Sequence, residues 1–335
     1  MGRTRVALLV GTAGTQRVFE PETLAKLGEQ VDLVAHDEER PPSADDARRL
    51  LAGAAACITS WGSPSFTPEL LDVAPELRLI VHAAGSIKPI VTDAVYERGI
   101  TITSGAPAIA AGVAETSLGL IITSMKNVFA LSTAIREGGW RAGRDARQHV
   151  KEMIGTTVGL VGAGHVGRRV LKLLSGFDVH VLLSDPTLTP AEAEALGATL
   201  VDLDTLMAES DVVSLHAPSI PATRHMINAG NLKLMKDGAT LINTARGSLI
   251  DEQALIKELS AGRIWACLDV TDPEPPAPDN PLQSMPNVVM TSHIAGSVST
   301  GLVRIGRYAA EEIGLFLAGK PALNPVTKEQ LAHLA

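Results

Sequence analysis

Short apolar runs of four or five residues alternate along this chain with stretches in which apolar positions recur every three or four residues. Such runs are typical of buried parallel strands, and the longer stretches are typical of the helices that connect them. In the first third, the runs predict strands at residues 6–10, 31–35, 56–60, 79–83 and 101–103. Helices are expected near residues 21–27, 44–52 and 68–72, and a turn is expected at residues 11–14.

One long helical segment separates this region from a second alternating region. Apolar residues recur at helical spacing from Ala110 to Glu137, which predicts a single helix, and a basic, polar connection follows over residues 141–148. Strands and helices then alternate over residues 157–296, and residues 302–318 predict a final helix. The whole pattern predicts an α/β fold of two doubly wound, Rossmann-like parallel-sheet domains.

A glycine-rich turn links the first strand of the second region to the helix that follows. It reads Gly162-Ala163-Gly164-His165-Val166-Gly167, after an apolar strand at residues 157–161. The first glycine permits the tight turn, the second lets the backbone approach a pyrophosphate, and the third lets helix and strand pack closely. The phosphates would lie on unpaired N–H groups at the positive helix end. This strand-turn-helix context favours a dinucleotide site over a glycine turn without a ligand.

Asp185 ends the next strand and indicates which dinucleotide binds. A carboxylate there can accept hydrogen bonds from the ribose hydroxyls and would repel a 2′-phosphate. No Arg or Lys occurs in residues 186–189 to neutralise such a phosphate. Asp185 therefore predicts NAD rather than NADP, although an Asp-Pro pair can also simply end a strand in a turn.

The position of this turn predicts how the chain is divided. At 335 residues the chain is long enough for two domains, each with its own core. Residues 108–299 contain the turn and are expected to form an NAD-binding domain. Residues 1–107 and 300–335 are expected to form a discontinuous substrate-binding domain.

Charge and cysteine content narrow the partners and the compartment. The formal net charge of −8 disfavours nucleic acid and anionic membranes. No apolar run approaches the roughly 18 residues that a membrane helix needs, and the run after Arg5 is too short for a secretory signal. Cys57 and Cys267 lie in apolar, strand-like segments, so buried thiols are expected rather than a disulfide or a metal site. The cytoplasm is the simplest compartment.

A second set of polar residues follows later strands, where such sheets place ligands. Arg246 follows one strand, Glu274 lies in an acidic segment after the next, and His293 follows a third. An arginine fork binds a carboxylate and polarises the adjacent carbonyl. A histidine gives or takes the proton on the substrate oxygen, and a carboxylate partner holds its tautomer. Each residue alone would more often be a surface or turn residue, but together they form a coherent catalytic set.

With these residues the chain resembles a known family, the D-isomer-specific 2-hydroxyacid dehydrogenases, which include 3-phosphoglycerate dehydrogenase and glyoxylate/hydroxypyruvate reductase. The resemblance covers nearly the whole chain. Its most specific motifs are Val113-Ala114-Glu115, Arg136-Glu137-Gly138-Gly139-Trp140, Val213-Ser214-Leu215-His216-Ala217-Pro218, Thr223-Arg224, Ile242-Asn243-Thr244-Ala245-Arg246-Gly247 and Leu268-Asp269-Val270.

The resemblance implies a role for each motif. Arg246 would bind the substrate carboxylate and carbonyl, His293 would be the general acid/base, and Glu274 would pair with His293. Asp269 would meet the nicotinamide side. The other cofactor-site residues would be Gly162, Gly164, His165, Val166, Gly167, Asp185, His216, Ala217, Pro218, Thr244, Ala245 and Ala295. The implied function is NAD-dependent hydride transfer at C2 of a small 2-hydroxy or 2-oxo acid, in a homodimer and without a metal.

Two segments depart from the family pattern. The loop that resembles G-x-G-x-D-N-I-D reads Ala83-Ala84-Gly85-Ser86-Ile87-Lys88-Pro89-Ile90 here, without the acidic ending. Ala84 and Gly85 still offer N–H groups to a substrate carboxylate, while Ser86 and Lys88 change the chemistry of the pocket wall. Lys88 is either a solvated loop residue or a cation for a second acidic group on the substrate. Ala295 stands where the family commonly has glycine and would narrow the nicotinamide pocket.

Several alternatives stay open at the level of sequence. Trp61 follows a first-domain strand, where its side chain either packs or faces the interdomain cleft. An NAD(H)-sensing scaffold similar to the C-terminal binding protein corepressors keeps the same three polar residues, but the lack of a basic cluster disfavours it. Formate oxidation is disfavoured, because formate dehydrogenases carry an amide where this chain has Glu274. The motifs leave the substrate and the physiological direction undetermined.

Overall fold

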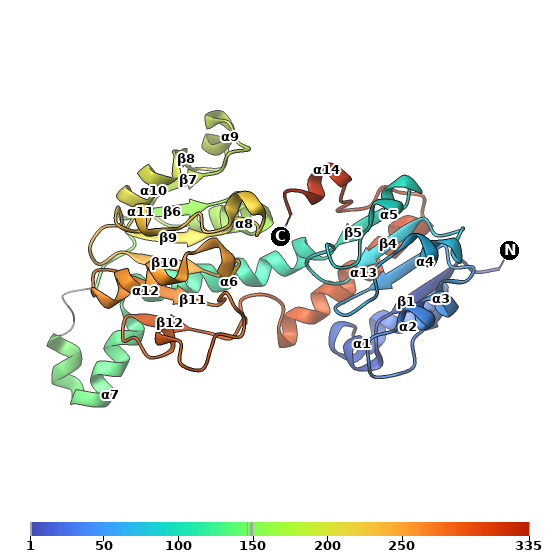
Figure 1. The fold of residues 1–335 in the computed structure, drawn as a ribbon, viewed down its shortest axis with the longest axis horizontal. Coiled ribbons are helices and arrows are strands. Elements are labelled where there is room, and N and C mark those ends of the chain that lie inside the picture. Colours follow the sequence, from blue (N-terminus) through green and yellow to red (C-terminus); the bar gives the residue numbers. More distant parts are fainter. Residues whose placement is uncertain (1, 146, 148–149, 335) are drawn as a thin grey trace. The chain divides into compact units, whose positions relative to one another are not determined.

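The computed structural model of the protein describes residues 2–145, 147 and 150–334. The chain forms two compact units, each of which is described by itself. Unit 1 contains the residues up to Ile109 and those from Ser297 onward, and unit 2 is Ala110–Gly296. Each unit is built on one parallel β-sheet with helices on both faces, which confirms the predicted fold class (Figure 1).

The sheet of unit 1 has five parallel strands in the order β2-β1-β3-β4-β5. All five strands predicted from the sequence are present. They are β1 (Arg5–Leu9), β2 (Asp32–Ala35), β3 (Ala56–Thr59), β4 (Leu79–His82) and β5 (Thr101–Ser104). The strand order reverses between β1 and β3, so this is the switch point where a doubly wound sheet can open a crevice.

Helices cover both faces of this sheet. Those of unit 1 are α1 (Thr12–Val18), α2 (Pro21–Gln30), α3 (Ala44–Leu51), α4 (Pro68–Asp72), α5 (Asp93–Glu97), α13 (Leu302–Leu317) and α14 (Lys328–Leu331). Side chains of α1, α2 and α13 pack on one face, and those of α3, α4 and α5 pack on the other. The expected turn at residues 11–14 is wrong, because the chain enters α1 at Thr12 and Val18 is buried in the core.

The sheet of unit 2 has seven parallel strands in the order β12-β11-β10-β9-β6-β7-β8. They are β6 (Thr157–Val161), β7 (His180–Ser184), β8 (Thr199–Leu200), β9 (Val212–Leu215), β10 (Thr240–Asn243), β11 (Trp265–Leu268) and β12 (Val288–Met290). The order reverses between β6 and β9, as in dinucleotide-binding sheets.

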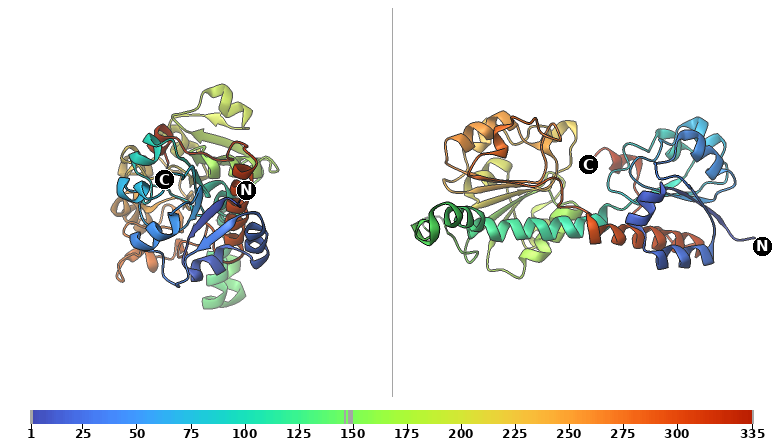
Figure 2. Two further views of the ribbon diagram at one scale, coloured as in Figure 1. Left: turned by 90° about the vertical axis from the view of Figure 1, so that its right-hand side faces the viewer. Right: turned by 90° about the horizontal axis from the view of Figure 1, so that it is seen from below.

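Two helical layers enclose this sheet. The helices are α6 (Ala106–Met125), α7 (Val128–Asp145), α8 (His165–Leu174), α9 (Pro190–Ala195), α10 (Leu203–Glu209), α11 (Ala229–Leu232) and α12 (Glu252–Ser260). Side chains of α6, α8 and α9 pack on one face, and those of α10, α11 and α12 pack on the other. In Figure 2, α6 runs along its face of the sheet. Cys57 and Cys267 are buried and unpaired, as the sequence predicts.

The expectation of one helix from Ala110 to Glu137 is wrong. α6 ends at Met125 and α7 begins at Val128, because Asn127 between them has a left-handed φ of 50°. α7 then continues into the segment expected to be a connection, with a left-handed φ of 74° at Gly139. Gly139 divides α7 into two parts. A Cβ on Gly143, in the second part, would overlap the side chain of Ile135 in the first, so this glycine lets the two parts pack closely. Gln148, the end of the expected connection, lies outside the described residues.

α6 also corrects the expectation that no apolar stretch approaches membrane-spanning length. By length and composition it is apolar enough to cross a membrane, with a mean hydropathy of 1.5. The core helices of soluble proteins can be equally long and equally apolar. Ala114, Ile121 and Met125 are buried against the unit 2 sheet, and the Ser117 hydroxyl lies 2.8 Å from the hydroxyl of Thr244. These contacts identify α6 as a helix that packs on this sheet.

Candidate active site

The predicted site residues of unit 2 gather at one edge of its sheet. In a parallel sheet the carboxyl ends of all strands meet at the same edge. The residues that follow these ends are Gly162 after β6, Asp185 after β7, His216 after β9, Thr244 after β10, Asp269 after β11 and Thr291 after β12. Ala84 and Gly85 follow β4 in unit 1.

The turn after β6 has the shape of a dinucleotide cradle. Gly162 has a left-handed φ of 99°, and a Cβ there would lie 2.9 Å from the backbone of His216 and Ala217. A Cβ on Gly167 would overlap the Gly162 carbonyl. A Cβ on Gly164 would meet no protein atom within 4 Å, so the backbone there is open to a ligand. No side chain caps α8 after Gly164, which leaves first-turn N–H groups for a pyrophosphate, and these residues fit NAD.

Asp185 is tied to this cradle. Its Oδ2 accepts a hydrogen bond from the Ala163 N–H at 2.7 Å, and its Oδ1 accepts from the N–H and hydroxyl of Thr187 at 2.8 and 2.6 Å. Burial acts to raise the pKa of Asp185, but these hydrogen bonds outweigh it and hold the pKa below its ordinary value. A carboxylate accepts about four hydrogen bonds, so roughly one position is left for a ribose hydroxyl.

The segment after β9 packs against the glycine turn that follows β6. The His216 N–H donates to the Val161 carbonyl at 2.7 Å, which holds this segment against the end of β6. Burial lowers the pKa of His216 to about 4, so its imidazole is neutral at physiological pH. Neither ring nitrogen has a hydrogen-bond partner among the described residues. Ala217, the next residue, is also buried.

Arg246 is presented by the loop after β10. Asn243 braces this loop, because its Nδ2 donates to the Arg246 carbonyl at 2.8 Å and its Oδ1 accepts from the Ala245 N–H at 3.0 Å. Burial lowers the pKa of Arg246, and the charge of Glu274 acts against this shift. An arginine stays protonated in proteins, and its Nη1 donates to the Ala245 carbonyl at 2.7 Å. The remaining donors of the fork are suited to a carboxylate.

His293 and Glu274 form a hydrogen-bonded pair. The Nδ1 of His293 lies 2.6 Å from Oε1 of Glu274, although the two residues come from the loops after β12 and β11. A carboxylate accepts only from a protonated Nδ1, so Glu274 sets the tautomer and leaves Nε2 for another partner. A Cβ on Gly247 would overlap the backbone of Thr271 and Asp272, so the Arg246 loop packs directly on the loop that carries Glu274.

Asp269 holds the segment that carries His293. Its side chain is only 1% exposed, and its carboxylate accepts hydrogen bonds from the Thr291 hydroxyl at 2.6 Å and from the N–H groups of Ile294 and Ala295 at 2.8 Å. The His293 N–H donates to the Asp269 carbonyl at 2.9 Å. His293 has a left-handed φ of 56°, a conformation that is uncommon outside glycine and that these contacts help to maintain.

Sequence reasoning missed the residues that support this edge. The Ser117 hydroxyl contacts Thr244, and the Thr116 hydroxyl donates to the Ala295 carbonyl at 3.4 Å, so α6 braces two of the loops. Asn243 lies inside one of the motifs, but nothing in its local pattern indicates which atoms it binds, and Thr291 lies in none of the motifs. Ser117 carries no signal in the sequence at all, because its partner is far away along the chain.

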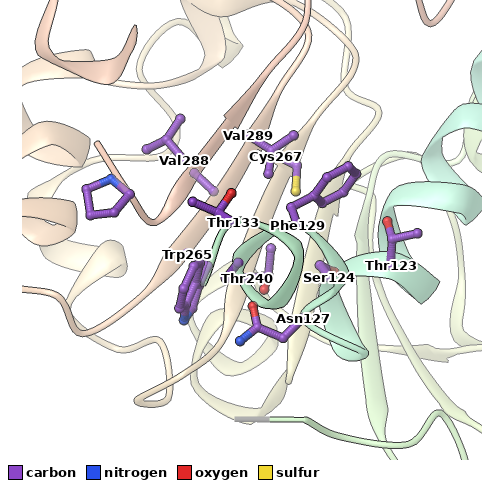
Figure 3. A pocket seen from close by; sticks show the side chains of 13 residues that line it. Thr123, Ser124, Asn127, Phe129, Thr133, Thr240, Trp265, Cys267, Val288 and Val289 are labelled. Atoms are coloured by element: carbon purple, nitrogen blue, oxygen red, sulfur yellow. The ribbon is translucent and has the colours of Figure 1, made fainter. Parts of the chain in front are cut away.

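A small cavity of about 90 Å³ lies elsewhere in unit 2 (Figure 3). Its lining includes Asn127, Phe129, Thr240, Trp265 and Val288. The last three stand at the amino-terminal ends of β10, β11 and β12, which is the edge opposite to the one with the site residues. This cavity is therefore separate from the candidate active site. Across the described part of the chain, no cluster of three or more His, Cys, Asp or Glu residues could hold a metal ion.

Comparison with known proteins gives a consistent result. The family model described as "D-isomer specific 2-hydroxyacid dehydrogenase, NAD binding domain" matches residues 118–295. A glyoxylate reductase from Thermofilum pendens is 35% identical over 321 residues, which cover 94% of this chain and 94% of that protein. A D-3-phosphoglycerate dehydrogenase from Archaeoglobus fulgidus is 35% identical over 259 residues, which cover 77% of this chain and 49% of that protein.

A solved structure extends this similarity to the whole fold. The apo form of D-mandelate dehydrogenase from Rhodotorula graminis is 26% identical, with a TM-score of 0.82 over 97% of this chain and 98% of that chain. This chain spans about half the length of several relatives named D-3-phosphoglycerate dehydrogenase. The matched domain binds NAD, which confirms the cofactor predicted from the glycine turn and Asp185.

Proposed function

Since this chain belongs to the D-isomer specific 2-hydroxyacid dehydrogenase family, we propose that it is an NAD-dependent oxidoreductase that interconverts a 2-hydroxy acid and a 2-oxo acid. The observation that carries this proposal is the His293–Glu274 pair on loops that pack beside Arg246. A fork for a carboxylate and an acid/base for an oxygen are the two groups that this reaction needs from a protein.

In the proposed mechanism, each of the three residues has one task. Arg246 binds the substrate carboxylate and polarises the adjacent C2 carbonyl. In reduction, Nε2 of His293 gives its proton to the C2 oxygen, and in oxidation it takes the proton from the hydroxyl. Glu274 accepts the hydrogen bond from Nδ1 and so fixes the tautomer and the orientation of the ring. The bound cofactor supplies or accepts the hydride at its nicotinamide ring.

The cofactor is proposed to lie along the carboxyl edge of the unit 2 sheet. Its pyrophosphate would rest on Gly164 and the first-turn amides of His165 to Gly167, and its ribose would meet Asp185. Thr244, Ala245 and Ala295 would border the nicotinamide, with His216 to Pro218 beside it. We assign Asp269 a positioning role, because all three of its observed partners belong to the segment around His293.

Ala84 and Gly85 of unit 1 are proposed as further substrate-binding residues, through their backbone amides. We test the function by following NADH oxidation with a panel of 2-oxo acids, and NAD reduction with the matching 2-hydroxy acids. Turnover supports the enzyme. NADH binding with no turnover of any acid would contradict it and favour an NAD(H)-sensing scaffold instead. The same assay with NADP(H) and with Asp185→Ala tests cofactor choice, since the variant should lose part of its preference for NAD.

A homodimer is part of the proposal, and the surface of α7 supports it. Val128, Phe129, Ile135 and Trp140 are exposed on this helix, and Trp140 is 73% exposed. Exposed apolar residues on one element are typical of an interface. Light scattering should give the mass of a dimer, and Trp140→Asp should shift it towards the monomer. A cytoplasmic location is proposed as well, because the two cysteines are unpaired.

A further inference from the structure

The cavity of unit 2 lies beside the break between α6 and α7. Side chains from the end of α6, the first turns of α7 and the amino-terminal ends of β10, β11 and β12 form its walls (Figure 3). Every lining residue belongs to unit 2. The volume is about 90 Å³, and one water needs about 10–15 Å³ of such space, so the cavity has room for about six to nine non-hydrogen atoms. This is the size of a molecule with a single ring.

Asn127 buries an amide without a partner in this cavity. The residue is only 8% exposed. Its backbone is hydrogen-bonded, because its N–H donates to the Ser124 carbonyl at 2.9 Å and its carbonyl accepts from the Leu131 N–H at 3.0 Å. Its side-chain amide has no hydrogen-bond partner among the residues that the structure describes. Buried polar groups are almost always hydrogen-bonded, so this amide needs a partner from outside the chain.

The remaining walls are mostly apolar and carry no charge. The rings of Phe129 and Trp265 line the cavity together with the side chains of Pro286, Val288 and Val289. No Asp, Glu, Lys, Arg or His is among the described residues that form it. A charged ligand would lose its hydration there without meeting an opposite charge, which is costly. The cavity therefore excludes carboxylates and phosphates and favours a neutral ligand.

An aromatic carboxamide suits both the amide and the rings. A carboxamide has a donor beside an acceptor, so it can form two hydrogen bonds with the side chain of Asn127. An aromatic ring gains buried area and ring–ring contact against Phe129 and Trp265. Water alone would satisfy the amide but would leave these rings hydrated.

A second copy of the chain is the competing occupant, because Phe129 also belongs to the exposed surface of α7. The exposed apolar side chains of that surface are those of Val128, Phe129, Ile135 and Trp140, and only the indole of Trp140 has a polar atom. An indole N–H donates but does not accept. Each of these side chains would therefore leave the NH2 group of Asn127 buried and unpaired, which disfavours a partner in the cavity.

We propose that this cavity is a binding site for a small neutral aromatic carboxamide, whose amide pairs with Asn127 and whose ring lies against Trp265. The site is separate from the candidate active site, because it lies at the opposite edge of the same sheet. The inference does not depend on the proposed function, since none of the residues proposed for hydride transfer or for the cofactor lines the cavity.

The test follows the indole N–H signals of isotope-labelled tryptophan by NMR. The chain has three tryptophans, Trp61, Trp140 and Trp265, and Trp265→Phe assigns the signal of the third. Benzamide is added to protein saturated with NADH, so that it cannot occupy the place of the nicotinamide ring. It should shift the Trp265 signal with a Kd of roughly 1 mM or lower and leave the Trp61 signal unchanged.

Two related compounds separate the effect of charge from that of the ring. Benzoate has the shape of benzamide but is charged, so it should bind at least about tenfold more weakly. Cyclohexanecarboxamide keeps the amide but not the aromatic ring, so it should bind about three- to tenfold more weakly.

Asn127→Gly tests the role of the amide. Glycine adopts a left-handed φ without strain, so the variant keeps the break between α6 and α7. Its affinity for benzamide should fall about tenfold or more, with a Tm close to that of the wild type. His225→Gly is the matched control, because His225 also has a left-handed φ, of 51°, in unit 2 and does not line the cavity. It should keep the wild-type affinity.

Four results would overturn the inference. The first three are an unshifted Trp265 signal at benzamide concentrations about tenfold above the expected Kd, equal binding of benzoate and benzamide, and an unchanged affinity for benzamide in Asn127→Gly. The fourth is binding to Trp140→Asp, the variant expected to be monomeric, but not to the wild type, which would assign the cavity to a second copy of the chain. The comparison of benzamide with benzoate needs no variant, so it remains decisive even if Asn127→Gly does not fold.

Discussion

Replacing Asp269 by asparagine tests whether this residue holds the segment that carries His293. The variant keeps the shape of the side chain but replaces one acceptor oxygen by an NH2 group. Two of the three observed donors, the Thr291 hydroxyl and the Ile294 N–H, share Oδ1, and the Ala295 N–H donates to Oδ2. An amide can keep the first two bonds, but its NH2 group then faces the third donor.

The cost follows from these contacts. The two bonds that remain lose their charge assistance, about 1 kcal/mol each. The Ala295 N–H is left without an acceptor, which costs about 2 kcal/mol. The sum of about 4 kcal/mol opposes the present conformation, in which His293 already adopts an uncommon left-handed φ. We expect the segment to shift and kcat to fall by about 10²- to 10³-fold as His293 moves away from the substrate oxygen.

The assay must separate positioning of His293 from a contact between Asp269 and the nicotinamide. ADP-ribose lacks the nicotinamide, so the affinities for NADH and ADP-ribose are measured together with kcat. A positioning role predicts a lower kcat with an unchanged ratio of the two affinities. Thr291→Ser should retain activity and Thr291→Val should lose part of it. An unchanged kcat at saturating NADH, with weaker binding of NADH but not of ADP-ribose, would refute the reasoning.

Three further predictions concern the same edge of the sheet. Glu274→Gln keeps the shape of the side chain but removes the charged acceptor that lies 2.6 Å from Nδ1 of His293, so kcat for reduction should fall by roughly tenfold or more while the affinity for NADH persists; an unchanged kcat would exclude this pairing from the mechanism. Arg246→Lys keeps the charge but loses the fork, so kcat/KM should fall by about 10²-fold or more while the affinity for NADH, measured by fluorescence, persists. Gly167→Ala should lower Tm by roughly 3–10 °C, because its Cβ would meet the backbone carbonyl of Gly162. Gly164→Ala should keep the wild-type Tm and weaken NADH binding, because its Cβ would meet no protein atom. Equal Tm values for the two variants would contradict the proposed packing of Gly167.

The site residues that follow strand ends could be predicted from the sequence, because each comes after an apolar run that marks a strand. Gly162 and Arg246 come directly or closely after apolar runs, and a parallel sheet then brings such positions to one edge. The hydrogen-bonded pair of His293 and Glu274 could be expected only from the family resemblance. Nothing in the local pattern of either residue points to the other.

The supporting contacts could not be predicted, because they join positions far apart in the sequence. Asp269 accepts from donors more than twenty residues later, two of them backbone N–H groups that any residue type would supply. The break between α6 and α7 has a similar origin. Helical periodicity continues across Asn127, and only the left-handed backbone of that residue separates the two helices. Periodicity indicates which face of a segment is apolar, but not where its axis turns.

The two units show why one doubly wound sheet provides a nucleotide cradle and the other does not. At the switch point of unit 2, a Cβ on Gly164 would meet no protein atom, and the start of α8 is open. At the switch point of unit 1, a Cβ on Gly11 would overlap the carbonyls of Glu39 and Arg40, and the Thr12 N–H donates to the Glu38 carbonyl at 2.8 Å. The chain after β2 thus occupies, with its own carbonyls, the place that phosphate oxygens would take.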